Sequence, residues 1–252
     1  MVDKMHIRWM EETDSTQDEV RRHFSEYDNL SVVAAIFQTA GRGQRGNTWH
    51  SRGGENLTFS MVLRFGEEGF PPLPVNESFL ITKAATLAVT KYLSEKEIAC
   101  SIKWPNDIYV RNKKICGMLI ENTLVTGNIA SSIVGIGLNV NQKEFPPQLL
   151  NPTSMTVLTG KSYDLVAELE ILSGYLADSF NRILTGGDTS SADQEYESLL
   201  YRRGAFHEYA ASPDGQVFEG KILGVTPGGL LCIEDKKGKL KKFAFKEISY
   251  II

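Results

Sequence analysis

Residues 38–64 read QTAGRGQRGNTWHSRGGENLTFSMVLR and join two segments that have the character of β-strands. Residues 32–37, VVAAIF, form a short apolar run that is typical of a buried strand. In residues 57–64, apolar side chains recur at every second position, which predicts a strand with one buried face. Residues 38–56 are therefore a long connection between two strands of one sheet.

This connection holds five glycines and three arginines, so it is too long and too charged for a hairpin turn. Glycines let the backbone approach a ligand and leave N–H groups free to bind an anion, and arginine binds carboxylate and phosphate. We interpret it as a loop that closes over an anionic small molecule. From composition alone, a mobile solvated loop is an equally weighted alternative. The glycines are 41, 43, 46, 53 and 54, and the arginines are 42, 45 and 52.

The spacing of Gly41, Gly43 and Gly46 also fits the dinucleotide-binding pattern G-x-G-x-x-G. That motif has to open a helix inside a βαβ unit. Here a strand follows, so we exclude a dinucleotide fingerprint.

The 252 residues are 42% hydrophobic and 23% charged, which is enough ordinary globular chain for one large domain and one small domain. No apolar run is long enough to cross a bilayer and residues 1–4 open no signal peptide, so we expect a cytoplasmic protein without a membrane partner. The net charge of −4 argues against a dedicated nucleic-acid binder. The three cysteines and four histidines have no metal-ligand spacing, so no metal site is predicted.

The coarse pattern of the rest predicts alternating strands and helices, then a glycine-punctuated β-rich tail. Thr16 and Glu19 form a capping box at a helix start. We place a domain boundary near Arg203, with domains 1–203 and 204–252. The other expected elements are strands at 7–10, 98–104, 108–110, 114–121 and 129–138, and helices from 76, from Asp164 to Gly186 and over 192–203.

A second polar cluster is Lys103-Trp104-Pro105-Asn106-Asp107, at the end of an expected strand, with Lys114 beyond the next turn. On a functional interpretation, Lys103 and Lys114 attract a phosphorylated ligand, Asn106 and Asp107 orient partners or a hydrated metal, and Trp104 or Trp49 offers a flat face to a base. On the alternative interpretation, Trp104 packs in the core and each lysine is solvated. The spacing does not show whether the two lysines lie close together.

Five segments, in this order, resemble the signature segments of biotin protein ligases: 12–16, 38–49, 103–107, 113–121 and 135–141. The resemblance implies an α+β fold in which helices pack on a mixed β-sheet, similar to the catalytic domain of class II aminoacyl-tRNA synthetases. A small SH3-like β-barrel is expected to follow. Some members carry an N-terminal DNA-binding domain, but Ser15 and Thr16 lie almost at the start of this chain, so a form without that domain and without a DNA partner is expected.

The resemblance implies a reaction in two steps. Biotin and ATP give biotinyl-5'-AMP and pyrophosphate, and a lysine of a biotin carboxyl carrier protein, a subunit of acetyl-CoA carboxylase or a related carboxylase, then takes the biotinyl group. Mg²⁺ would be bound mainly through the phosphates. Catalysis would rest on positioning and charge stabilisation, without a nucleophilic side chain. Whether the protein forms a homodimer through exposed sheet edges is left open by the sequence.

Carried over position by position, the resemblance implies three sets of residues. Lys114, Arg42 and Asp107 would be catalytic. Biotin would be bound by Ser15, Thr16, Gln17, Gln38, Gly41, Arg42, Gly43, Gln44, Lys114 and Gly117. ATP and the adenylate would be bound by Arg42, Arg45, Trp49, Lys103, Asn106, Lys114 and Asn139.

Two departures from the family pattern concern ligand binding. Gln17 stands where many members have Asn, and Gln44 stands where Arg is common, so one expected cation is missing from the glycine-rich loop. We expect looser retention of the intermediate, with Arg45 as a partial substitute for the missing cation. Two alternative functions stay open at this point: a lipoate or octanoate ligase of the same fold, and a non-catalytic biotin or nucleotide sensor.

Overall fold

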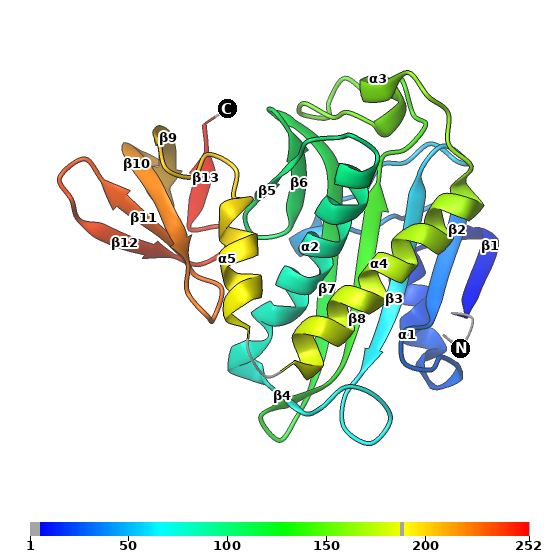
Figure 1. The fold of residues 1–252 in the computed structure, drawn as a ribbon. Helices are drawn as coiled ribbons and strands as arrows, with labels where there is room; N and C mark the ends of the chain where they lie inside the picture. Colours follow the sequence, from blue (N-terminus) through cyan, green and yellow to red (C-terminus); the bar gives the residue numbers. More distant parts are fainter. Residues whose placement is uncertain (1–5, 187–188, 252) are drawn as a thin grey trace.

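The computed structural model describes residues 6–186 and 189–251, except for the side chain of Arg45. The chain forms an eight-stranded mixed sheet and a separate five-stranded antiparallel sheet (Figure 1). This architecture confirms the predicted fold class: helices on a mixed sheet, followed by a small β domain.

The large sheet has the strand order β1-β2-β3-β8-β7-β6-β5, and β4 pairs with β8. Only the β1–β2 pair is parallel among these pairings. The strands are β1 Ile7–Thr13, β2 Val32–Gln38, β3 Leu57–Arg64, β4 Leu73–Pro74, β5 Ser101–Lys103, β6 Asp107–Val110, β7 Lys113–Val125 and β8 Asn128–Leu138. The expected hairpin across residues 111–113 is thus the β6–β7 turn, and its second strand runs four residues further than predicted.

Strand β3 is buried on both faces, although its alternating pattern predicts one buried face. The second face is covered by the short helix α1 (Thr16–Arg22). Val20 of this helix packs with Val62 of β3 and Ile133 of β8 in a separate hydrophobic cluster. A seven-residue helix with one buried stripe is therefore enough to bury the second face of β3.

Two long helices, α2 (Phe79–Glu95) and α4 (Leu165–Thr185), pack together over the other face of the sheet (Figure 1). Asp164 caps α4 as predicted, and its carboxylate accepts hydrogen bonds from the N–H groups of Val166 and Ala167. No described helix is both long and apolar enough to cross a membrane. The shorter helices are α3 Met155–Thr159 and α5 Ser190–Ser198, with single turns η1 Phe24–Glu26, η2 Gln44–Gly46 and η3 Val75–Glu77.

Three local predictions differ from the structure. Ser15, not Thr16, is the N-cap of α1, and its hydroxyl accepts a hydrogen bond from the N–H of Gln17 at 3.3 Å. Thr16 is the first helical residue, and its hydroxyl lies instead 2.9 Å from that of Ser60. The last helix ends at Ser198 rather than residue 203, and the strand expected over 98–104 is only Ser101–Lys103.

The small sheet has the order β12-β11-β10-β9-β13 and packs beside α5 (Figure 1). The indole N–H of Trp104 donates to the carbonyl of Gly229 at 3.0 Å, and Glu197 accepts from the N–H of Val225 at 3.1 Å. Tyr209 belongs to the same buried cluster as Trp104, so the hydrophobic core continues across residues 203 and 204. The domain boundary at this position stays a prediction. The strands are β9 Phe206–Ala211, β10 Gln216–Val225, β11 Leu231–Asp235, β12 Leu240–Phe243 and β13 Ile248–Tyr250.

Candidate functional site

A cavity of about 510 Å³ lies where the glycine-rich loop, the start of α1, the turn after β5 and the C-terminal segment meet. Its floor is formed by the middle of β7 and the end of β8. The structure therefore brings together segments that are far apart in the sequence. The predicted site residues that line it are Ser15, Thr16, Gln17, Gln38, Arg42, Gly43, Gln44, Trp49, Lys103, Asn106, Asp107, Lys114 and Gly117.

One end of the cavity is lined by uncharged polar side chains that are already hydrogen-bonded. The carbonyl oxygen of the Gln38 side chain accepts from the N–H of Thr16 at 2.8 Å. The hydroxyl of Ser60 donates to Gln17 Oε1 at 3.1 Å, and Gln17 Nε2 donates to the carbonyl of Ile133 at 3.0 Å. Ser15, Thr16, Gln17 and Ser60 are all at most 4% exposed, so their hydrogen-bonding groups are fixed before any ligand arrives.

The floor of the cavity contains glycines at positions where a side chain would collide with Trp49 or Lys114. Gly117 and Gly137 are directly paired across β7 and β8. A Cβ on Gly137 would lie 2.2 Å from the indole of Trp49, and one on Gly117 would lie 2.9 Å from Lys114 Nζ. The indole N–H of Trp49 is buried and has no hydrogen-bond partner among the described residues, so it is free to bind a ligand.

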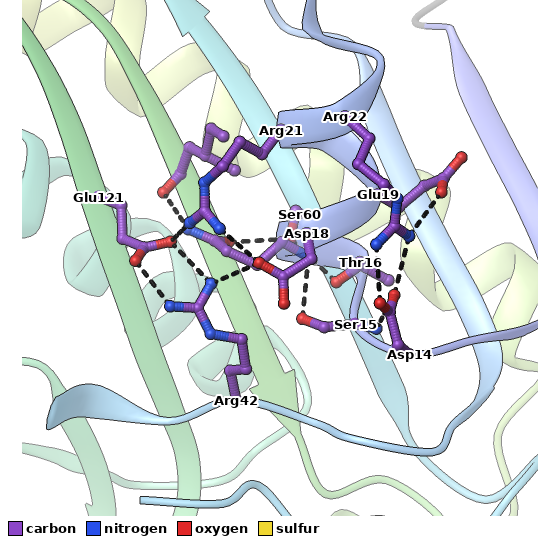
Figure 2. A network of polar contacts seen from close by, with 12 residues as sticks. Asp14, Ser15, Thr16, Asp18, Glu19, Arg21, Arg22, Arg42, Ser60 and Glu121 are labelled. Atoms are coloured by element: carbon purple, nitrogen blue, oxygen red, sulfur yellow. Dashed lines mark hydrogen bonds and ion pairs between the residues drawn. The ribbon is translucent and has the colours of Figure 1, made fainter. Parts of the chain in front are cut away.

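Arg42 extends from the glycine-rich loop into a network of carboxylates (Figure 2). Its guanidinium donates to Asp18 Oδ1 at 2.8 Å and to Glu121 Oε1 at 2.9 Å. Arg21 contacts the same two carboxylates at 2.5 Å. Burial acts to raise the pKa of Glu121, but hydrogen bonds from Gln17 and Arg42 outweigh it and lower the pKa. These ion pairs fasten the loop to strand β7.

The Lys103–Asp107 segment and Lys114 meet at the far side of the cavity, which the spacing alone does not show. Lys114 Nζ lies 2.7 Å from Asp107 Oδ1. Lys103 donates to the hydroxyl of Tyr109 at 3.2 Å. Burial lowers the pKa of Lys103, Asp107 acts to raise it, and the charges of Lys114 and Arg202 lower it further. This end of the cavity therefore carries concentrated positive charge.

Three predicted residues are placed differently. Asn139 does not line the cavity, because its side-chain amide donates to the carbonyl of Thr153 at 2.9 Å. Gly41 lies beneath Trp49, where a Cβ would meet the tryptophan carbonyl at 2.5 Å, and it borders a smaller hollow of about 360 Å³. The side chain of Arg45 lies outside the described part of the structure. Adenylate binding by Asn139 and Arg45 stays a prediction.

Some lining residues have no counterpart among the predicted ones. The most distant in sequence come from the turn before β13 and from β13 itself: Phe245, Lys246, Ile248, Ser249 and Tyr250. Their position depends on how the small sheet docks against Trp104, whose ring lies 6.1 Å from that of Phe245 in an edge-on arrangement. No motif in the sequence signals that docking.

Comparison with known proteins points to one family. Residues 9–139 match the description "Biotin/lipoate A/B protein ligase family". The solved structure "Biotin protein ligase from Aquifex aeolicus in complex with biotin and ATP" is 27% identical, superimposes with a TM-score of 0.75, and the match covers 97% of each chain.

Relatives known by sequence agree. "Bifunctional ligase/repressor BirA" of Bacillus subtilis is 32% identical over 218 residues, which are 85% of this chain and 64% of that protein. "Biotin--[acetyl-CoA-carboxylase] ligase" of Paracoccus denitrificans is 27% identical over 90% of this chain and 93% of that protein. The chain thus spans a little under two thirds of the Bacillus relative's length. With the family match covering more than half of the residues, this chain belongs to the biotin/lipoate A/B protein ligase family.

Proposed function

We propose that this protein joins biotin to a specific lysine of a biotin carboxyl carrier protein in the cytoplasm, through biotinyl-5'-AMP. One observation carries the proposal: the cavity has a neutral, hydrogen-bonded end at Gln17 and a basic end at Lys103 and Lys114. A cavity of about 510 Å³ is of the size that holds a small-molecule ligand. This polarity suits a substrate whose head group is neutral and whose tail becomes joined to a nucleotide.

In the first step, a carboxylate oxygen of biotin forms a bond to the α-phosphorus of ATP. The bond from that phosphorus to the bridging oxygen breaks, and pyrophosphate leaves with the electron pair. Both reactants are anions, so the enzyme has to supply fixed positive charge where they meet. Lys114 would supply it at the acyl phosphate, and Arg42 would do so from the loop that borders the same cavity.

Asp107 is the one carboxylate residue among the described residues that line the cavity. Mg²⁺ on a nucleotide is usually held by one or two carboxylates together with the phosphates, so the site fits the ion. Asp107 would hold it, and the bound ion would neutralise phosphate charge.

In the second step, the carrier lysine nitrogen forms a bond to the acyl carbon of biotinyl-5'-AMP. The bond from that carbon to the phosphate oxygen breaks, AMP leaves with the electron pair, and the nitrogen loses a proton to solvent. Asp107, whose side chain is 27% exposed, would orient the incoming amine by accepting a hydrogen bond from it. No residue of the enzyme has to become covalently attached.

The choice of biotin over lipoate rests on the neutral end of the cavity. Biotin's ureido group donates and accepts hydrogen bonds, whereas the dithiolane ring of lipoate is apolar. The hydroxyl and amide groups of Ser15, Thr16 and Gln17 can form further hydrogen bonds with a ureido group, whereas a dithiolane can form none with them. The site therefore favours biotin over the sulfur-containing acid.

The test is to incubate the protein with ATP, Mg²⁺ and a purified biotin carboxyl carrier domain, with biotin or lipoate as the acid. Mass spectrometry should show one biotinyl group on the carrier lysine and no lipoyl group. A carrier domain with its acceptor lysine replaced by arginine is the matched control and should stay unmodified. Modification by lipoate alone would favour the sister activity, and binding of biotin and ATP without any product would favour a sensor.

A further inference from the structure

Arg42 is the polar anchor of the first half of the glycine-rich loop. The N–H groups of Gly43 and Trp49 form hydrogen bonds within the loop, at 2.7 Å and 2.9 Å. Among the described side chains of residues 41–48, only that of Arg42 forms hydrogen bonds to other elements. A short hairpin-like loop is at most marginally stable by itself. The polar attachment of this part of the loop therefore depends on what holds Arg42.

Two carboxylates from two different elements hold Arg42 (Figure 2). Asp18 belongs to α1, and Glu121 belongs to β7. Besides the contacts at 2.8 Å and 2.9 Å, Arg42 Nη1 lies 3.3 Å from Glu121 Oε2, so both Nη atoms of the guanidinium contact this carboxylate. Such a forked pair fixes the orientation of a guanidinium as well as its position. The loop is thus fastened at a defined point between a helix and a strand.

Arg21 sets the charge that the two carboxylates present to Arg42. It lies on α1 rather than on the loop, and it contacts Asp18 and Glu121 at 2.5 Å each. Arg21 balances one of the two negative charges, and the other remains for Arg42. The four side chains are between 28% and 50% exposed, so water partly screens the attraction. The carboxylates therefore favour a closed loop and can still release it.

The two carboxylates hold Arg42 from outside the cavity. Arg42 lines the cavity of about 510 Å³, whereas Asp18 and Glu121 do not. Glu121 instead borders the smaller hollow of about 360 Å³, which Arg42 also borders. A ligand in the larger cavity is therefore walled by the loop and by Arg42, and the carboxylates act on it only through the position of the loop.

We infer that Asp18 and Glu121 are positioning residues that hold the glycine-rich loop closed over the cavity through Arg42, and thereby slow the escape of biotinyl-5'-AMP. The part that concerns the intermediate rests on the proposed function. The part that concerns the loop does not, because every contact in the network joins two groups of the protein itself. The intermediate leaves only when the loop lifts, so the ion pairs of Arg42 set how often it can leave.

The experiment compares wild type with Glu121→Gln and Asp18→Asn, which remove one negative charge and keep the size of the side chain. The first readout is hydrogen–deuterium exchange of the Gly43 and Trp49 amides in the free protein. We expect exchange to be about fivefold faster in each variant, the upper end for loss of one partly exposed ion pair. The second readout is the dissociation rate of supplied biotinyl-5'-AMP, which should rise by a similar factor because escape requires the same opening.

Two controls separate the effect on the loop from a general loss of stability. Glu195 also pairs with an arginine, Arg182, at 3.0 Å, but this pair joins α5 to α4 and lies outside the cavity. Glu195→Gln should leave both readouts at the wild-type values. In an Arg42→Met background, Glu121→Gln should cause no further acceleration of amide exchange, because the contact that it would weaken is already absent.

Amide exchange at the wild-type rate in Glu121→Gln and Asp18→Asn would overturn the inference. A full fivefold effect of Glu121→Gln in the Arg42→Met background would also overturn it, because Glu121 would then act other than through Arg42. Faster amide exchange with unchanged dissociation would overturn the part that concerns the intermediate. If the wild type did not bind biotinyl-5'-AMP at all, the proposed function would fail instead, and amide exchange in the free protein would still decide whether the carboxylates hold the loop.

Discussion

Replacing Lys114 by alanine separates catalysis from stability, because we expect its ammonium to contribute much to the rate of adenylate formation and little to the free energy of unfolding. Its Nζ lies 2.7 Å from Asp107 Oδ1, and the two side chains are 31% and 27% exposed. The backbone of Lys114 also holds the chain in place, donating to the carbonyl of Asn151 and accepting from the N–H of Thr153. Those backbone hydrogen bonds survive the substitution.

The expected magnitudes follow from this geometry. A partly solvated ion pair of this kind contributes about 0–1 kcal/mol to stability. For a chain of this size, that corresponds to a fall in Tm of at most about 4 °C. Losing one preorganised charge at the transition state typically costs about 10²–10³ in rate. Lys114→Ala should therefore unfold almost like the wild type while adenylate formation falls at least about a hundredfold.

The assay is formation of biotinyl-5'-AMP under single-turnover conditions, with thermal unfolding followed in parallel. Lys113 is the matched control, since it is the neighbouring lysine on β7 and is exposed outside the cavity. Lys113→Ala should form the adenylate at the wild-type rate. Unchanged adenylate formation in Lys114→Ala would refute its assignment, and a rate loss matched by a large fall in Tm would show that folding was the cause.

Three further substitutions test the floor of the cavity, the helix α4 and the ion pair between Asp14 and Arg22. Gly137→Ala places a Cβ 2.2 Å from the Trp49 indole, so the ring has to move at a cost of about 1–3 kcal/mol and calorimetry should show weaker ATP binding; unchanged affinity would contradict this. Gly174 lies inside α4 with open space around it, so Gly174→Ala should raise Tm by about 2–4 °C, and a lower Tm would refute the reasoning. Hydrogen bonds from Arg22 hold the pKa of Asp14 well below its usual range. The ion pair therefore stabilises the fold in full above the unfolded-state pKa of about 3.9, and this stabilisation is lost as the pH falls further toward the folded-state pKa. The difference in urea midpoint between wild type and Asp14→Asn should shrink as pH falls toward about 3 and reach its full size near neutral pH, whereas a pH-independent difference would contradict the sign.

Local patterns in the sequence predicted much of the framework. The alternation in residues 57–64 identified β3, and the turn residues at 111–113 identified the β6–β7 hairpin. Asp164 marked the start of α4 because an aspartate before an apolar helical stripe satisfies free N–H groups. These features depend on neighbours in the chain, which a sequence displays directly.

The features that the sequence did not predict depend on contacts between residues that are far apart in the chain. The second face of β3 is buried because α1 lies across it, and periodicity along β3 carries no information about that helix. The carboxylates that hold Arg42 come from positions 18 and 121, on two other elements. The C-terminal residues that line the cavity lie where the small sheet docks on the large one, with Phe245 against Trp104, and this docking joins parts of the chain that are far apart in the sequence.

Biotin-dependent exchange of labelled pyrophosphate into ATP tests the central claim most directly, because it reports the adenylation step without any acceptor protein. The purified wild-type protein should catalyse exchange with biotin and Mg²⁺, and exchange should fall to background when biotin is omitted or replaced by lipoate. Exchange with lipoate alone, or no exchange with either acid, would contradict the claim that this cavity activates biotin.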